Sequence, residues 1–319
     1  MANTYKPEGL ILGTPQNREL LASGRSGLER AMSNDIIMES TALLCDKDMN
    51  IHVDLRGITG IIPKEEVCLC KDGEEMKDIA VITRVGKPIC FKVLSIKEIN
   101  GRPVAYLSRR AAQMECKRNY ISNLIPGDII CSRVTHLEGF GAFVDIGCGI
   151  ISLLSVDCIS VSRFSHPRDR LYCGMVINTV VKSIDEEKDR IFVSMRELLG
   201  TWQENADLFA PGQTVAGIIR SVESYGVFVE LTPNLAGLAE IRDDIPFLRD
   251  GDAVGRLAAV YIKSIIPERM KIKLVLVDAY KGDVASSGLE YFVDCEKISH
   301  LHNWRYSPPS CSKIIETVF

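Results

Sequence analysis

The sequence lacks the features of a membrane or secreted protein. It has no run of about 18 apolar residues, the length a membrane-spanning helix needs. The first residues, MANTYKPEGLILG, lack the basic region and small-residue cleavage site of a secretory signal. Its eleven cysteines form neither a C-x-x-C pair nor a regular framework, which is typical of free thiols in a reducing compartment. We therefore expect a cytoplasmic protein with no membrane partner.

Motifs for catalysis and nucleotide binding are missing as well. The chain contains no GxxxxGKS or GxxxxGKT, no GxGxxG and no GxSxG stretch. A metal site could be drawn from Cys295, His300, His302 and Cys311, but their spacing fits no common zinc pattern. The acidic run 185–187 is interpreted as a charged hairpin turn, not as paired catalytic carboxylates. The sequence thus predicts no enzyme, no cofactor and no metal.

An excess of positive charge is also absent. The net charge is −4 and the isoelectric point is near 5.8, which argues against binding duplex DNA mainly through phosphate neutralisation. Hydrophobic residues make up 46% and charged residues 25% of the 319 positions, as in globular chains of two or three domains. If this protein binds nucleic acid, something besides net charge must supply much of the affinity.

Several stretches of the sequence occur twice. HLEGFGAFVDIG at 136–147 is matched by SVESYGVFVELT at 221–232, and VVKSI at 180–184 by YIKSI at 261–265. A Pro-Gly pair precedes each copy, at 126–127 and 211–212. Alternating apolar runs between turn residues indicate strands, and a small unit rich in strands avoids exposed edges by closing into a barrel.

A third, degenerate copy is expected upstream, with strands near 53–55, 60–63, 91–96 and 106–110. It lacks the aromatic–glycine–small–phenylalanine stretch, so we expect a weaker binding face or none. Thr201 and Glu204 have the spacing of a capping box and predict a connecting helix. The expected organisation is an N-terminal helical segment (1–33), a degenerate barrel (34–111), a barrel (126–197), a linker helix (198–210), a barrel (211–278) and a tail (279–319) that packs on the preceding barrel.

Aromatic pairs stand out in the two clear repeats: Phe140 with Phe143, and Tyr225 with Phe228. Strict alternation would put positions three apart on opposite faces of a strand. The glycine inside each pair permits a bulge or strong coiling, so both rings can share one surface. Unpaired bases stack on such rings at roughly 1–3 kcal/mol each. The alternative is that one ring of each pair belongs to the core.

Basic residues repeat with the aromatic pairs. Lys182 and Arg190 of one copy correspond to Lys263 and Lys271 of the other. Lys273 adds charge to the second of these copies, and Arg133 and His136 add charge to the first. Lysine or arginine beside a stacked base can reach a phosphate or cover the base plane. The alternative is an ordinary solvated face.

The quoted stretches GFGAFVDIG and VVKSIDEEKDRIFVSMRE, with SYGVFVEL and YIKSIIPERMKIKLV, resemble the S1 RNA-binding domain, an OB-fold family. The whole chain, including RVGKPICFKV, LLGTWQEN and WRYSPP, resembles the S1-like ribosomal proteins of clostridia and related Firmicutes. The resemblance implies a mainly β chain of tandem five-stranded OB-fold barrels of S1 type, joined by short helices after an N-terminal helical segment.

The RNA face of that family comprises two aromatic residues, a histidine, an aspartate and an arginine. In the first clear repeat the resemblance implies Phe140, Phe143, Asp185 and Arg190, while Ser152 stands at the histidine position.

In the second clear repeat the resemblance implies Tyr225, Phe228 and Lys271. Glu240 takes the histidine position and Ile266 the aspartate position, so this face departs further from the family pattern.

The resemblance implies a protein that binds single-stranded RNA, in particular mRNA, and that acts in translation with the small (30S) ribosomal subunit as a further partner. Two alternatives stay open. The chain could be an accessory module of a nuclease or of a metabolic reductase, because S1 domains are attached to both. It could also use its rings to dock another protein, which suits the acidic net charge.

Overall fold

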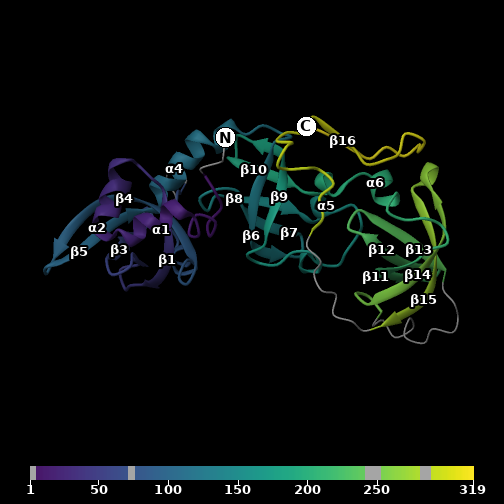
Figure 1. Cartoon of the computed structure of the whole chain (residues 1–319), viewed down its shortest axis with the longest axis horizontal. Coiled ribbons are helices and arrows are strands. Elements are labelled where there is room, and N and C mark those ends of the chain that lie inside the picture. Colours follow the sequence, from purple (N-terminus) through teal and green to yellow (C-terminus); the bar gives the residue numbers. More distant parts are fainter. Residues whose placement is uncertain (1–4, 71–75, 241–252, 281–288) are drawn as a thin grey trace. The chain divides into compact units, whose positions relative to one another are not determined.

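The prediction of a mainly β chain of tandem OB-fold barrels is confirmed. A computed structural model describes residues 5–70, 76–240, 253–280 and 289–319, and over these ranges it forms three closed five-stranded barrels (Figure 1). Two compact units divide the chain: one comprises 1–124, 131–133 and 145–151, and the other the remaining residues. No helix in the described ranges is long and apolar enough to cross a membrane.

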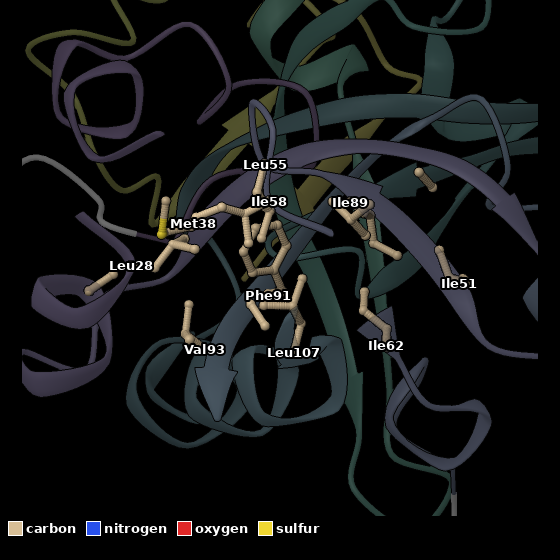
Figure 2. Close-up of a cluster of buried hydrophobic side chains, with 14 of the residues drawn as sticks. Leu28, Met38, Ile51, Leu55, Ile58, Ile62, Ile89, Phe91, Val93 and Leu107 are labelled. Carbon is tan, nitrogen blue, oxygen red and sulfur yellow. The ribbon is translucent and has the colours of Figure 1, made fainter. Parts of the chain in front are cut away.

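The first barrel has the strand order β1-β2-β3-β5-β4, with β3 and β5 parallel. Its strands are β1 (Met38–Cys45), β2 (Ile51–Asp54), β3 (Thr59–Ile62), β4 (Pro88–Ile99) and β5 (Arg102–Ser108). Strands β2 to β5 overlap the four strands expected for the degenerate copy, whereas β1 was not predicted and residues 109–110 begin a helix instead of ending a strand. Figure 2 shows the buried Phe91 of β4 in the middle of the core, with Ile58 and Leu107 close to it.

Two helices before the first barrel help to close its core. The backbone breaks between α1 (Pro15–Ala22) and α2 (Gly24–Ser33), where Gly24 adopts φ +57°. Thr14 caps α1 by accepting a hydrogen bond from the Asn17 N–H at 3.3 Å, and proline at the first helical position suits this start. Leu20 and Leu28 pack into the barrel core, so the predicted helical segment contributes to that core.

Short helices fill the other connections of this unit: η1 (Lys64–Glu66), α3 (Asp78–Ile82), α4 (Arg109–Asn119) and η2 (Ile121–Asn123). Arg109 at the start of α4 donates to both carboxylate oxygens of Glu8, at 2.7 and 3.0 Å. Burial acts to raise the pKa of Glu8, but the adjacent guanidinium outweighs it and the pKa is lowered. Asp145 accepts the N–H groups of Glu8, Gly147 and Gly149 at 2.7–3.0 Å. Glu8 is therefore ion-paired and Asp145 is hydrogen-bonded, as burial of polar groups requires.

The second barrel repeats the strand order as β6-β7-β8-β10-β9, with β8 and β10 parallel. Its strands are β6 (Ile129–Glu138), β7 (Gly141–Asp145), β8 (Ile151–Ser155), β9 (Val176–Asp185) and β10 (Arg190–Ser194), with α5 (Val156–Ile159) and η3 (Pro167–Asp169) inserted between β8 and β9. Ala142, Val144, Leu154 and Val181 point inward and are fully buried.

The third barrel has the order β11-β12-β13-β15-β14. Its strands are β11 (Thr214–Glu223), β12 (Gly226–Thr232), β13 (Leu235–Glu240), β14 (Leu257–Ile266) and β15 (Lys271–Tyr280), with η6 (Pro267–Arg269) before the last. The predicted connecting helix is in fact two short pieces, η4 (Arg196–Leu199) and α6 (Trp202–Ala206). Gly200 separates them with φ +83°, while Thr201 and Glu204 form the predicted capping box at the start of α6.

Buried ion pairs join the loop before β9 to the third barrel. The Glu230 carboxylate on β12 accepts two hydrogen bonds from Arg170, at 2.9 and 2.6 Å, and two from Arg220 on β11, at 2.8 and 3.1 Å. Glu230 and the side chain of Arg170 are almost inaccessible to solvent. Each charged group in this cluster has a partner of opposite charge. Removing one member would leave a buried charge uncompensated, which lowers the stability of the fold.

The end of the C-terminal tail packs on the third barrel, as predicted, whereas its earlier residues Ser299 and Leu301 bond to the second barrel. It contains a two-stranded sheet of β16 (Asn303–Arg305) and β17 (Glu316–Val318). Trp304 and Tyr306 join the hydrophobic cluster of the third barrel. The Tyr306 hydroxyl donates to the Asn234 carbonyl at 2.5 Å, and the Trp202 N–H donates to the Tyr306 carbonyl at 3.0 Å.

Candidate nucleic-acid interface

A glycine brings Phe140 and Phe143 to one surface of the second barrel. Gly141 lies so close to β8 that a Cβ atom there would be 2.4 Å from the Leu154 carbonyl oxygen, so no larger residue fits without moving backbone. The chain turns sharply at this point, and the two rings meet edge to face with their centroids 5.9 Å apart. Phe140 is 57% exposed and Phe143 is half-buried. The rings form an outward-facing pair.

The third barrel repeats this arrangement. A Cβ atom at Gly226 would lie 2.8 Å from the Ala239 carbonyl oxygen. Tyr225 and Phe228 again meet edge to face, with centroids 6.2 Å apart, and Tyr225 is 65% exposed. Two barrels therefore present the same aromatic pair at the same place in the fold.

The pairing of the strands places further side chains on the same outer face as each aromatic pair. In the third barrel Phe228 pairs with Leu238 of β13, which pairs with Lys273 of β15. Directly paired residues point to the same face of a sheet, so Lys273 shares the outer face with Phe228. Lys271 is two residues away on β15 and shares this face too.

The corresponding row of the second barrel contains a ring that the sequence analysis missed. Leu153 of β8 pairs with Phe192 of β10 in the same way as Leu238 pairs with Lys273. Phe192 therefore stands where the third barrel has Lys273, and it is half-buried. Arg190, two residues earlier on β10, is exposed on the same face. The signal in the sequence was the period of two from Arg190 to Phe192.

His136 adds an imidazole ring to the second barrel's surface. It stacks on Phe143 with an interplanar angle of 22° and a centroid distance of 6.3 Å. Its Nε2 lies 2.7 Å from a carboxylate oxygen of Glu138. The sequence indicates His136 only as added charge on this barrel, because nothing in the sequence places β6 against the Phe143 ring.

The repeated lysines occupy equivalent bulges. The register of β9 with β10 shifts around Lys182, and that of β14 with β15 shifts around Lys263. Lys182 donates to the Cys158 thiol at 3.0 Å, which raises the pKa of Lys182. Lys263 lies 3.4 Å from the Glu240 carboxylate, and both side chains are more than half exposed. An exposed pair of this kind is weak, so Lys263 stays available to a ligand.

Asp185 and Arg190 face each other at the β9–β10 hairpin as a directly opposed pair. Asp185 accepts the Lys188 N–H at 3.0 Å, and the Lys188 ammonium lies 3.6 Å from its other oxygen. The carboxylate thus shapes the charged turn that the sequence predicted at 185–187. Ile266 and Lys271 are paired in the same way in the third barrel, so the third barrel keeps the cation of this pair and lacks the acid.

One residue assignment of the sequence analysis is wrong. Ser152 is buried and donates its hydroxyl to the Ile191 carbonyl at 2.6 Å, so it points away from the aromatic pair. Gly141 approaches Leu154 and Ser155 as Gly226 approaches Ala239, which makes Ser155 the counterpart of Glu240. The error arose because side chains alternate between the two faces of a strand, and the wrong register had been assumed for β8.

The cysteine and histidine residues of the tail are not gathered at one point. Within the described ranges, no three His, Cys, Asp or Glu side chains come together as metal ligands. His300 is instead paired with Asp128, its Nδ1 lying 2.8 Å from a carboxylate oxygen.

The three barrels place the chain in the class of tandem OB-fold proteins. Residues 124–196, the second barrel, match the family model described as "S1 RNA binding domain". The match covers the barrel that carries Phe140, Phe143, Asp185 and Arg190.

Over a longer stretch than the second barrel, the chain is similar to small ribosomal subunit protein bS1. It is 30% identical to that protein of Leuconostoc lactis over 235 residues, covering 70% of this chain and 52% of the relative. The bS1 homolog of Bacillus subtilis is 30% identical over 192 residues, with coverages of 58% and 47%. The chain thus spans about half the length of these curated relatives. Among solved structures, a multidomain protein with nucleic acid binding domains from Streptococcus pneumoniae is 16% identical, with 76% of this chain and 73% of that chain covered and a TM-score of 0.24.

Proposed function

We propose that the second and third barrels bind single-stranded RNA by stacking its bases on their aromatic pairs, with backbone contacts from the neighbouring cations. The single observation that carries this proposal is the exposed edge-to-face ring pair found at equivalent places of both barrels. A folding core would bury such rings, whereas unpaired bases need flat apolar surfaces that stand in solvent.

The electrostatics favour stacking as the main source of affinity. With a net charge of −4, the whole chain repels a phosphate backbone, so attraction must come from local groups. Arg190 in the second barrel, with Lys271 and Lys273 in the third, supplies positive charge beside the rings. Lys182, Lys263 and Asp185 border these surfaces and are proposed to position the strand.

The biological role follows from the relatives and is part of the proposal. The similarity to bS1 supports a function in translation, in which the chain holds mRNA near the small ribosomal subunit in the cytoplasm. No reaction is proposed, because stacking and ion pairing account for the roles given to these residues.

Equilibrium titration tests the binding proposal directly. A fluorescent, unstructured RNA of about 12 nucleotides would be titrated with the intact chain and with a variant carrying Phe140→Ala, Phe143→Ala, Tyr225→Ala and Phe228→Ala. We expect the variant to lose at least a hundredfold in affinity, because several stacked bases at roughly 1–3 kcal/mol each are removed.

Tyr172→Ala is the matched control. Tyr172 is 57% exposed, the same fraction as Phe140, yet it lies in the loop before β9 and outside the aromatic pair. The control should bind RNA like the unmodified chain. Equal affinities of the fourfold variant and the control would remove stacking as the mechanism.

The ribosomal part of the proposal needs a separate measurement. Sedimentation of a cell extract through a sucrose gradient should place the chain with 30S particles, and ribonuclease treatment of the extract should release it if mRNA is the link. Recovery of a nuclease or a reductase, with no 30S particles, would instead favour the accessory-module alternative.

A further inference from the structure

The second and third barrels differ at the beginning of their first strands, β6 and β11. In the third barrel β12 pairs with β11 only from Ile218 onward, and the residues before Ile218 pair with β14 alone, so this part of the strand has one edge outside the barrel's own strand pairing. In the second barrel the C-terminal tail adds a short antiparallel strand there: the Leu301 N–H donates to the Gly127 carbonyl and the Ile129 N–H donates to the Ser299 carbonyl, both at 2.8 Å. A β-bridge joins Asp128 to His300 between these bonds. A segment of this chain therefore occupies the edge.

The equivalent edge of the third barrel is open within the described part of the chain. Gly212 corresponds to Gly127, since each donates its N–H across the barrel, to Ile262 and Val181 respectively, at 2.8 Å. A Cβ atom at Gly127 would be 2.1 Å from the Leu301 carbonyl oxygen, whereas one at Gly212 would have no described atom within 4 Å. Residues 212–214 are all exposed.

The outer face beside this edge is likewise covered in the second barrel, and in the third it is exposed as far as the described residues go. Val180 pairs with Ser194, and Tyr261 occupies the corresponding position opposite Val275. Val180 is 0% exposed although it lies on the outer face, while Tyr261 is 41% exposed. A hollow surrounds this tyrosine on the outside of β11, β14 and β15, and it is lined by Thr214, Tyr261, Lys263, Val275 and Val277.

We propose that this open edge and hollow form a docking site for an extended segment of a partner protein, which adds to the third barrel as the tail adds to the second. Main-chain hydrogen bonds would come from the Thr214 N–H and the Gly212 carbonyl, the counterparts of the Ile129 and Gly127 groups that hold the tail. Strand addition of this kind takes affinity from main-chain bonds and specificity from the side-chain pockets alongside.

The lining of the hollow sets the chemistry of the partner. In the second barrel Ser299 lies beside Ile129, so the partner residue at this position would lie beside Thr214, over the Tyr261 ring and Val275. An apolar side chain fits there. Two residues later the partner would pass Gly212, near Lys263, where an acidic side chain is favoured. The site is therefore specific for an extended segment with an apolar residue followed, two positions on, by an acid.

A synthetic peptide tests this inference. The probe is a fluorescent peptide of residues 296–304 of this chain carrying Ser299→Leu and Leu301→Glu, titrated against the intact protein by fluorescence anisotropy. Two control peptides carry Ser299→Leu with Leu301→Pro, which removes the donor N–H, or with Leu301→Lys, which reverses the charge. We expect the probe to bind at least tenfold more tightly than either control, and hydrogen exchange at 212–216 to slow.

Variants of the protein locate the site. Tyr261→Ala should weaken probe binding about tenfold, the size of a strong anchor residue, and leave RNA affinity unchanged. Tyr225→Ala should do the reverse, which separates this inference from the RNA-binding proposal. Absence of probe binding at 1 mM peptide would overturn the inference. So would a Tyr261→Ala variant that loses RNA affinity and binds no peptide, because the hollow would then belong to the nucleic-acid path.

Discussion

Phe140→Ala offers the sharpest test of how the second barrel holds RNA. The ring is 57% exposed, and its described ring contact is the edge-to-face pair with Phe143. Removing it should cost at most about 0.5–1.5 kcal/mol of folding free energy. If one base stacks on it, the loss of binding free energy should be about 1–3 kcal/mol, which is a roughly 5- to 150-fold rise in Kd. Binding and stability should therefore respond very differently.

The salt dependence of RNA affinity distinguishes the contribution of the Phe140 ring from that of the Arg190 cation. Each phosphate contact on single-stranded nucleic acid contributes a slope of about −0.7 to log K against log salt concentration. Arg190→Gln removes one charge, so its slope should be less steep by about 0.7. Phe140→Ala removes no charge, so its line should run parallel to that of the unmodified chain and lie below it.

The assay is RNA titration by fluorescence anisotropy at several salt concentrations between 50 and 300 mM, with urea unfolding of each variant measured in parallel. Tyr172→Ala serves as the control of equal exposure. The stacking argument fails if Phe140→Ala binds as well as Tyr172→Ala. It also fails if Phe140→Ala changes the salt slope as much as Arg190→Gln, because the ring would then be acting through the charges around it.

Three further predictions concern the scaffold. Gly141→Ala should destabilise the protein by about 1–3 kcal/mol and weaken RNA binding, because its Cβ would lie 2.4 Å from the Leu154 carbonyl oxygen. Gly139→Ala is the control, since a Cβ there would meet no described atom within 4 Å. Urea unfolding and RNA titration should show no change in stability or affinity for this control. Burial raises the pKa of Asp145 to about 7, against about 3.9 in an unfolded chain. The folded state therefore favours the protonated acid. The stability that protonated Asp145 contributes is complete below about pH 4 and is lost as the pH rises through 7. The melting temperature of Asp145→Asn should therefore improve relative to the unmodified chain between pH 4 and 8, and a constant difference would contradict the assignment. Glu230→Gln removes the counter-charge of the buried Arg170 and leaves Arg220 with Asp169 alone, 3.7 Å away. It should cost about 3–5 kcal/mol in chemical denaturation, and a loss under 1 kcal/mol would argue against a buried ion cluster.

Much of the architecture was readable from the sequence because strands and turns leave local signals. Alternating apolar runs between glycine and proline residues marked the barrel strands, and the capping-box residues Thr201 and Glu204 marked the start of α6. The duplicated stretches identified the aromatic pairs, because the same ring–glycine–ring order in two copies is hard to explain by core packing alone. These features depend on residues close together in the chain.

The rest of the surface depended on which strands lie side by side. Phe192 joins the Phe143 face only because β10 runs parallel to β8 in the closed barrel, and Ser155 takes the position first assigned to Ser152 only because of the register of β8 against Gly141. A shift of one residue moves a side chain to the opposite face, and the sequence of one strand does not state its register with the next.

The sequence by itself determined the repeat and predicted the barrels, since these follow from local alternation and from turn residues. That the rings face outward was one of two alternatives in the sequence, and the structure decided it. Only the tertiary structure decided that the tail completes the edge of the second barrel at Gly127 and leaves Gly212 of the third uncovered by any described residue. The physical reason is that this pairing joins residues far apart in the chain, Asp128 and His300, so no local pattern in the sequence announces it.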